Sequence, residues 1–204
     1  MPERKPCSRT SPGPGEDIRA LKRQARALLK ERSLALPPGE WRRLSLILCR
    51  RLWEDPFYAE AKTVFCFVGV RGETDTRPFL TRVLEDGKIL AVPRCGPGGT
   101  LTAHVLTDPD ALRPGAWGLP EPEEDTPVLP REETDLAVVP CLGADREGFR
   151  LGRGGGYYDR YLAGFPGRSL LVCPRFLLLD RVPREPFDLP ADRLITDETP
   201  EKPF

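Results

Sequence analysis

Hydrophobic residues recur along this chain with two periods, one typical of amphipathic helices and one typical of buried strands. From Asp17 on, apolar side chains repeat every three to four residues, which predicts a helix that ends before Pro37. A second helix is predicted from about Gly39, and it stops at Pro56. The first helix also carries basic side chains off its apolar stripe, at Lys22, Arg23, Arg26 and Lys30.

The strand pattern begins with Thr63–Val70, a continuous apolar run rich in β-forming residues and typical of a strand buried on both faces. A short helix follows, with Asp75 and Thr76 as caps and Gly87 just past its end. The remaining predicted strands are Lys88–Pro93, Leu101–Leu106 as an edge strand, Asp135–Pro140, Ser169–Cys173 and Arg193–Thr196. Alternating strands and helices predict an α/β fold with a mostly parallel sheet covered by helices.

The domain organisation follows from the same pattern. Residues 1–15 are rich in proline and glycine without periodicity, which predicts a disordered leader, and residues 16–204 are expected to form a single α/β domain. A loop of about 28 residues after Leu106, dense in proline and acidic side chains, is expected to be functional or mobile. Because parallel sheets bind ligands at the carboxyl ends of their strands, the loops after Val70, Pro93 and Pro140 are the expected site.

Composition excludes several classes of protein. The chain of 204 residues has no apolar window long enough to span a membrane, and its six dispersed cysteines are interpreted as reduced core thiols of a cytoplasmic protein. The single histidine, His104, is expected to have a structural role, and it cannot assemble a zinc site without a cysteine cluster. Zero net charge disfavours a general nucleic-acid or membrane binder. Residues 1–53 nevertheless carry a net charge of +8, which calls for an anion or for the acidic remainder of the chain.

The strongest chemical signal is the segment RLGRGGGYYDRYL at residues 150–162. Glycines without a Cβ let backbone N–H groups approach a phosphate, and Arg150 and Arg153 can add charge-assisted hydrogen bonds. No GK[ST] follows, so this is not a Walker A loop, and Tyr157 occupies the place of the third glycine of a dinucleotide fingerprint. A flexible surface turn is the alternative for the glycines alone. The glycines concerned are Gly152, Gly154, Gly155 and Gly156.

This segment resembles the signature of the 5-formyltetrahydrofolate cyclo-ligase family, which reads approximately RLGxGxGYYDxxL. The resemblance extends from about Asp17 to Glu198 in the family's order, and it implies a three-layer fold of the NagB/RpiA/CoA-transferase type, with helices on both faces of the sheet. The further matching positions are Lys22, Arg26, Glu73, Thr76, Gly118, Glu121, Pro122, Asp188, Asp192, Ile195, Thr196 and Glu198. The family's Pro-Gly-x-x-Phe is replaced here by Pro140, Cys141 and Ala144, so we expect an aromatic wall near the folate to be missing.

The resemblance implies that the protein converts 5-formyltetrahydrofolate and ATP to 5,10-methenyltetrahydrofolate, ADP and phosphate. It assigns the phosphates of ATP to the glycine loop, the basic residues and both tyrosines, that is, to Lys22, Arg26, Arg150, Gly152, Arg153, Gly154, Gly155, Gly156, Tyr157 and Tyr158. Without the resemblance, Lys22 and Arg26 read equally well as a solvated basic face. Such a reaction positions and stabilises a phosphoryl group, so it needs neither histidine nor cysteine.

The resemblance also implies roles for the other site residues. Arg153 and Tyr157 are the expected catalytic residues, and the expected substrate-binding residues are Val68, Glu73, Arg153 and Tyr157. Asp159 and Asp188 are the expected ligands of Mg²⁺. The alternatives are a carboxylate at a helix N-terminus for Asp159, a capping residue for Glu73 and ordinary packing for Tyr157.

Two rival functions remain open at this point. An RNA-binding module would use the basic N-terminal segment and the Arg/Gly/Tyr patch. An α/β enzyme of the same fold could instead act on a sugar phosphate or a CoA ester. The expected partners are 5-formyltetrahydrofolate and ATP, with no nucleic acid, no membrane and a monomeric state.

Overall fold

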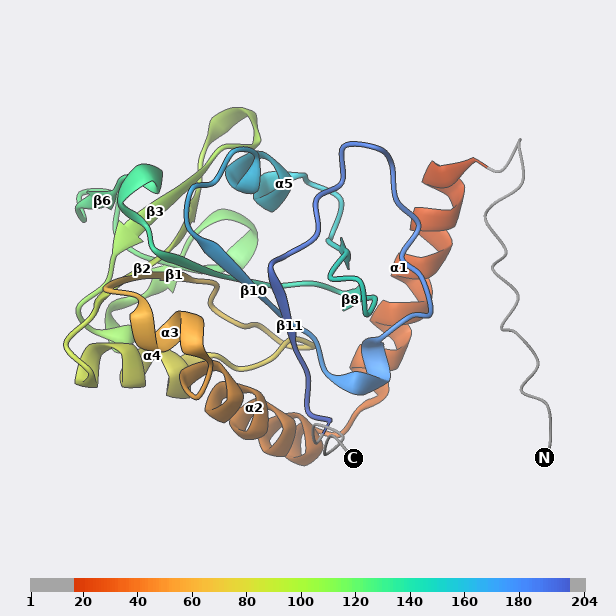
Figure 1. Cartoon of the computed structure of the whole chain (residues 1–204), viewed down its shortest axis with the longest axis horizontal. Coiled ribbons are helices and arrows are strands. Elements are labelled where there is room, and N and C mark those ends of the chain that lie inside the picture. Colours follow the sequence, from red (N-terminus) through yellow and green to blue (C-terminus); the bar gives the residue numbers. More distant parts are fainter. Residues whose placement is uncertain (1–16, 199–204) are drawn as a thin grey trace.

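The structure, a computed structural model, describes residues 17–198. Its main sheet contains the strands β1 (Thr63–Cys66), β2 (Ile89–Cys95), β3 (Leu101–Val105), β6 (Val128–Leu129), β7 (Leu136–Val139), β10 (Arg168–Val172) and β11 (Arg193–Ile195). Their order across the sheet is β11-β10-β7-β1-β2-β3-β6, and the first five are parallel (Figure 1). The predicted leader at residues 1–15 lies outside the described residues.

The described residues form five α-helices, two of which begin at an aspartate whose side chain caps the helix. They are α1 (Ile18–Ala35), α2 (Pro38–Trp53), α3 (Pro56–Glu60), α4 (Arg77–Glu85) and α5 (Tyr157–Leu162). The side chain of Asp17 accepts a hydrogen bond from the backbone N–H of Arg19 at 2.9 Å, as an N-cap does. Helix α3 is not predicted by the pattern, which treats Pro56 only as a stop. Asp55 and Pro56 in fact form an N-cap followed by an N1 proline, which begins a new helix.

Helices cover both faces of the sheet, as predicted. On one face, α2, α3 and α4 pack over Val64 and Val138, whose side chains point to that side. On the other face, α1, α5 and the small hairpin β8 (Gly143–Ala144) and β9 (Arg150–Leu151) pack over Phe65 and Val139. Since successive side chains of a strand point to opposite faces, each buried strand contributes to both cores. The chain is therefore a three-layer α/β structure (Figure 1).

Strand β3 is not at the edge of the sheet, contrary to the prediction. It pairs antiparallel with β2 and also with β6, which is only two residues long and too short to leave a pattern in the sequence. The acidic loop after β3 is folded rather than open, because β4 (Arg113–Pro114) and β5 (Pro120–Glu121) pair within it. The short 3-10 turns are Pro97–Gly99, Pro109–Ala111, Ala116–Gly118, Arg131–Glu133 and Arg175–Leu177.

The cysteines only partly follow the prediction of core thiols. Cys49, Cys66 and Cys173 are buried free thiols, whereas Cys95 and Cys141 are partly exposed and line a cavity. Cys7 lies outside the described residues. Between residues 17 and 198, no helix has both the length and the apolar character needed to cross a membrane.

Candidate active site

A cavity of about 800 Å³ opens at the carboxyl ends of the central strands. Val70 and Glu73 follow β1, Cys95 ends β2, and Pro140 and Cys141 follow β7, and all five line this cavity. The three loops expected from the sequence therefore meet, because parallel strands end at the same edge of the sheet. The volume is in the range of pockets that bind small molecules, about 300 to 1,000 Å³.

The glycine loop, residues 152–156, connects β9 to α5 and forms one wall of the cavity. Gly154 has a φ of +102° and Gly156 a φ of +69°, values that side chains with a Cβ rarely adopt. Gly154 also lies beside the guanidinium of Arg26, which a Cβ at residue 154 would meet at 3.5 Å, an ordinary van der Waals distance. The backbone path therefore requires glycine at residues 154 and 156, and residues 152–156 all line the cavity.

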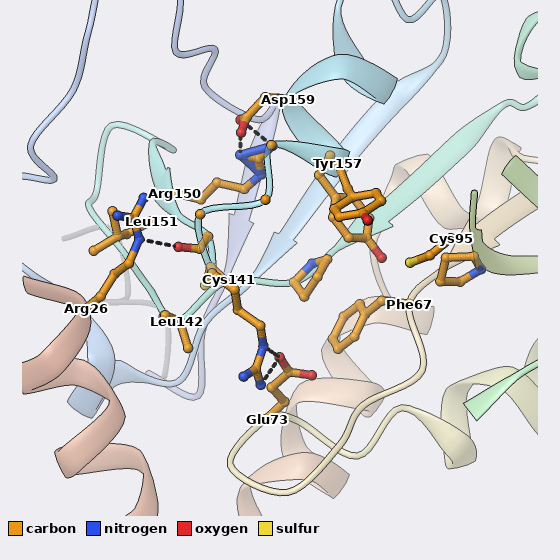
Figure 2. A pocket seen from close by; sticks show the side chains of 18 of the residues that line it. Arg26, Phe67, Glu73, Cys95, Cys141, Leu142, Arg150, Leu151, Tyr157 and Asp159 are labelled. Carbon is orange, nitrogen blue, oxygen red and sulfur yellow. Dashed lines mark hydrogen bonds and ion pairs between the residues drawn. The ribbon is translucent and has the colours of Figure 1, made fainter. Parts of the chain in front are cut away.

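Helix α1 places its basic side chains against this loop. The Nε of Arg26 donates to the carbonyl oxygen of Gly152 at 2.9 Å (Figure 2). The Nζ of Lys22 donates to Glu185 at 2.9 Å and to Asp188 at 2.6 Å. Burial lowers the pKa of Lys22, but the two carboxylates raise it more, so that the ammonium group stays charged. The basic N-terminal segment thus meets both an open cavity and acidic groups of its own chain.

Two further ion pairs tie the loop to its surroundings (Figure 2). Arg150 donates through Nη1 and Nη2 to one oxygen of Asp159 at 2.8 and 2.7 Å, and its side chain is only 6% exposed. Arg153 donates through Nε and Nη2 to Oε1 of Glu73 at 3.0 and 2.7 Å. The side chain of Arg153 is 55% exposed, so this arginine is free to turn toward a ligand, whereas Arg150 is fixed.

Aromatic side chains form another part of the lining. The ring of Tyr157 packs edge-on against Trp117 with centroids 5.7 Å apart, and the guanidinium of Arg160 lies 5.5 Å from its centroid. Phe67 and Trp117 also line the cavity. The cavity therefore has aromatic side chains in its lining, while the absence of an aromatic wall beside the folate stays a prediction. Ala144 is fully buried and is not among the residues that line the cavity.

Val68 and Tyr158, two further predicted site residues, also line the cavity. Val68 is 8% exposed and lines it just beyond β1. Tyr158 packs against Phe65 with ring centroids 6.2 Å apart, and burial raises its pKa well above the ordinary value. The hydroxyl of Tyr158 thus stays protonated and can only donate or accept as a neutral group.

The predicted metal ligands do not form a cage. Among residues 17–198, no group of three or more His, Cys, Asp or Glu side chains is arranged to hold a metal ion. Asp159 uses Oδ1 for Arg150 and is 48% exposed. Asp188 uses Oδ2 for Lys22 and for the backbone N–H of Glu185. These residues fit a metal only in the manner of Mg²⁺ in nucleotide sites, where one or two carboxylates are completed by phosphate oxygens and water.

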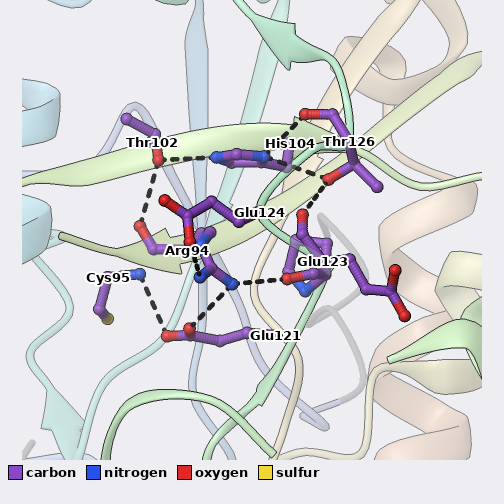
Figure 3. A network of polar contacts seen from close by, with 9 residues as sticks. Arg94, Cys95, Thr102, His104, Glu121, Glu123, Glu124 and Thr126 are labelled. Atoms are coloured by element: carbon purple, nitrogen blue, oxygen red, sulfur yellow. Dashed lines mark hydrogen bonds and ion pairs between the residues drawn. The ribbon is translucent and has the colours of Figure 1, made fainter. Parts of the chain in front are cut away.

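A polar network fixes the acidic loop against β2 and β3 (Figure 3). His104 is 5% exposed and bonds to Thr102 through Nε2 at 3.0 Å and to the carbonyl of Thr126 through Nδ1 at 3.0 Å. Glu121, on the cavity wall, accepts from the backbone N–H of Cys95 at 3.1 Å. Burial, with the Glu121 carboxylate second, raises the pKa of Cys95 to about 11. Because the ring of His104 is buried and bonded to Thr102 and Thr126, this histidine has the structural role predicted for it.

Several lining residues have no signal in the sequence. Glu185 accepts a hydrogen bond from Lys22 at 2.9 Å and lines the cavity, yet it belongs to no motif. Glu185 reaches the site only because the C-terminal segment folds back along α1 (Figure 1). Cys95 and Phe67 are likewise absent from the prediction, since an apolar residue at a strand end looks the same whether it faces the core or a cavity.

The fold and the site define an α/β protein whose cavity suits a small molecule with several negative charges. Residues 18–197 match the model of the 5-formyltetrahydrofolate cyclo-ligase family. The chain belongs to this family, and the resemblance drawn from the glycine segment is confirmed.

Individual relatives agree with the match. The chain is 29% identical over 196 residues to the 5-formyltetrahydrofolate cyclo-ligase of Mus musculus, covering 90% of this chain and 97% of the relative. It is 34% identical over 155 residues to the 5-formyltetrahydrofolate cyclo-ligase of Mycolicibacterium smegmatis, covering 72% of this chain and 79% of the relative. The solved structure of 5,10-methenyltetrahydrofolate synthetase from Aquifex aeolicus superimposes with a TM-score of 0.78 at 32% identity, covering 88% of this chain and 91% of that structure's chain.

Proposed function

We propose that this chain catalyses the ATP-dependent cyclisation of 5-formyltetrahydrofolate to 5,10-methenyltetrahydrofolate, with release of ADP and phosphate. Family membership over residues 18–197 supports the reaction. The observation that supports this reaction in the present chain is a single cavity lined by the glycine loop, the basic residues of α1 and the carboxylate of Glu73. A nucleotide and a pterin can therefore meet in one site.

The chemistry explains why ATP is needed. Direct attack of N10 on the formyl carbon would have to expel hydroxide, a poor leaving group. Transfer of the γ-phosphoryl group to the formyl oxygen gives an iminium phosphate and ADP. Attack by N10 then closes the ring, and phosphate leaves with the oxygen. The protein's task is to position these groups and to stabilise the moving negative charge.

The phosphates are bound by the glycine loop and by basic side chains around it. Lys22, Arg26 and Arg153 bind the triphosphate together with the backbone N–H groups of residues 152–156. In the absence of ligand, Lys22 and Arg153 are paired with carboxylates, so the substrate anions replace partners of the same charge. Arg150, buried and paired with Asp159, supports the loop from below.

The pterin lies on the other side of the cavity. Glu73 accepts hydrogen bonds from pterin N–H groups, and Val68 and the Tyr157–Trp117 pair contact the ring and the formyl group. Arg153 lies between the two halves, because it contacts Glu73 and belongs to the glycine loop. It is therefore the side chain best placed to follow the charge from the γ-phosphate to the formyl oxygen.

Mg²⁺ is the cofactor that this reaction calls for, and it supplies charge neutralisation at the phosphates. Asp159 is its main ligand, because the side chain is half exposed and only Oδ1 is engaged by Arg150. Asp188 is the second ligand, which requires Lys22 to move from the carboxylate to a phosphate. We further propose a monomeric, cytoplasmic enzyme that binds neither nucleic acid nor membranes.

Formation of methenyltetrahydrofolate is the direct test. The purified protein is incubated with 5-formyltetrahydrofolate, ATP and Mg²⁺, and the growth of the near-ultraviolet band of the product is followed. No absorbance change at saturating ATP contradicts the proposal. A thermal-shift panel with ATP, 5-formyltetrahydrofolate, ribose phosphate and RNA separates the rival functions. The proposed enzyme should be stabilised by ATP and by 5-formyltetrahydrofolate, and not by ribose phosphate or RNA.

A further inference from the structure

Two cysteines meet at the carboxyl ends of β7 and β10, beside the cavity. The parallel register of these strands pairs Val139 with Leu171, and the same register carried two residues further brings Cys141 opposite Cys173. The Sγ of Cys141 donates to the carbonyl oxygen of Val172 at 3.4 Å, the residue directly before Cys173. Both cysteines belong to the core on the same face of the sheet. The two thiols are therefore neighbours across adjacent strands.

The spacing of the strands fits a disulfide. Neighbouring strands lie about 4.8 Å apart, and the Cα atoms of disulfide-bonded cysteines are usually separated by about 4.4 to 6.8 Å. Side chains in register on adjacent strands that point to one face also bring their Cβ atoms together. A bond between Cys141 and Cys173 can therefore close with a small movement of the loop after β7.

The two thiols differ in their access to solvent. Cys141 lines the cavity (Figure 2), whereas Cys173 is fully buried. Burial, with the neighbouring Cys141 thiol second, raises the pKa of Cys173 well above its ordinary value. Cys141 is consequently the thiol that a reagent in the cavity meets first. The other buried thiols, Cys49 and Cys66, lie in the opposite core and do not line the cavity.

We propose that Cys141 and Cys173 form a reversible intramolecular disulfide in the presence of a low-molecular-weight disulfide such as oxidised glutathione. The Cys141 thiolate attacks one sulfur of the small disulfide, a mixed disulfide forms, and one small thiolate leaves. Cys173, on losing its proton, attacks the Sγ of Cys141 and expels the second small thiolate. Two protein thiols are oxidised by two electrons, and one small disulfide is reduced to two thiols.

The bond reshapes the floor of the cavity. Closing it brings the two sulfur atoms to about 2.05 Å, well inside their van der Waals contact distance. Pro140 and Leu142, on either side of Cys141, line the cavity, and the backbone N–H of Leu142 donates to the carbonyl of Leu151 at 2.8 Å. Movement of this loop therefore reaches the residue directly before the glycine loop. The effect on catalysis rests on the proposed function, whereas formation of the disulfide does not.

Peptide mapping tests the disulfide itself. The full-length protein is incubated with oxidised glutathione, remaining thiols are blocked with iodoacetamide, and the digest is analysed by mass spectrometry with and without dithiothreitol. We expect a linked pair of peptides containing Cys141 and Cys173, lighter by two hydrogen atoms and separated by dithiothreitol. A mixed disulfide that persists at Cys141, or a linkage to any other cysteine instead, overturns the proposal.

Three variants make the test specific. Cys141→Ser and Cys173→Ala should each abolish the linked peptide, and the mixed disulfide should accumulate in the Cys173→Ala protein. Cys95→Ser removes the other cavity thiol, at the end of β2, and should leave the linkage intact. If Cys173→Ala does not fold, the map of the wild-type protein decides alone. Loss of the linkage in Cys95→Ser contradicts the assignment.

Activity is the second measurement. Oxidised wild-type enzyme should lose turnover by about tenfold or more, since a 1 Å misplacement in an active site costs on the order of 100-fold, and dithiothreitol should restore it. Cys141→Ser should keep its turnover under oxidised glutathione. If the linkage forms and turnover does not change, the effect on the site is wrong. If neither oxidised nor reduced protein forms product, the proposed function fails and the disulfide stands.

Discussion

Glu73 offers the sharpest test of how the site is divided between nucleotide and folate. The change Glu73→Gln keeps the shape of the side chain and removes its charge. In the free protein it weakens two hydrogen bonds from Arg153, of 2.7 and 3.0 Å, to one oxygen. Charge-assisted bonds contribute about 1 kcal/mol more than neutral ones, and Arg153 is 55% exposed, so solvent screening reduces this further. We expect a loss of less than about 1 kcal/mol in the free energy of unfolding.

The effect on folate should be larger than the effect on stability. A glutamine offers one neutral acceptor and one N–H donor where the carboxylate offered two anionic acceptors, so one pterin N–H group loses its partner. Loss of a hydrogen bond to a charged group costs about 1.5 to 3 kcal/mol, which corresponds to a rise in Kd of about tenfold or more. Affinity for ATP should stay the same or increase, because Arg153 is no longer held by an anion.

Isothermal titration calorimetry with each ligand and a thermal melt measure these quantities. Glu147→Gln is the matched control, since Glu147 pairs with Arg184 at 2.9 Å and does not line the cavity. If Glu73→Gln loses stability but keeps both affinities, Glu73 is a capping residue. If ATP and folate affinity collapse together in a folded protein, the division of the site into two halves is refuted.

Three other changes have definite expected outcomes. Arg153→Ala should raise the Kd for ATP by about tenfold or more, by loss of a charged phosphate contact, with the circular dichroism spectrum unchanged; equal affinity removes Arg153 from the site. Asp159→Asn should increase the Mg²⁺ concentration needed for half-maximal turnover, because Oδ2 loses its charge; an unchanged Mg²⁺ titration limits Asp159 to its ion pair with Arg150. Burial raises the pKa of Asp192, but hydrogen bonds from Ser169 hold this pKa below the ordinary value of 3.8. The carboxylate therefore stabilises the folded protein above that pH, and this stabilisation disappears as the pH falls and the group is protonated. The Asp192→Asn variant should therefore unfold at a lower urea concentration than the wild-type protein at neutral pH, and the gap between the two urea midpoints should narrow in acid. A gap that does not change with pH contradicts this account.

Most of the fold is readable from local patterns. The buried strands are continuous apolar runs, since both of their faces are covered, and the long helices are amphipathic stripes with a cap at Asp17 and prolines beyond. Elements of two residues, such as β6, carry no period and cannot be predicted in this way. Pro56 misleads because a proline both ends one helix and begins another.

The candidate site is readable only in part. Glycines at 154 and 156 are dictated by the backbone path, so their chemistry appears in the sequence itself. The partners of the charged residues do not appear there. Arg153 meets Glu73 across 80 residues, because the loops that carry them lie at one edge of the sheet, and Lys22 meets Asp188 across 166, because the C-terminal segment folds back along α1.

The α/β class, the glycine loop and the family to which the chain belongs all follow from the amino-acid sequence, because each rests on residues that are close together along the chain. Three-dimensional packing was needed to show which carboxylate neutralises which cation, that Cys141 lines a cavity at the border of the core, and that Cys173 lies beside it. Such contacts depend on the register and order of strands, which a local pattern does not encode. The neighbouring thiols are set by that register and the ion pairs by how helix α1 and the loops pack together, whereas helices and strands are set by the period of their own side chains.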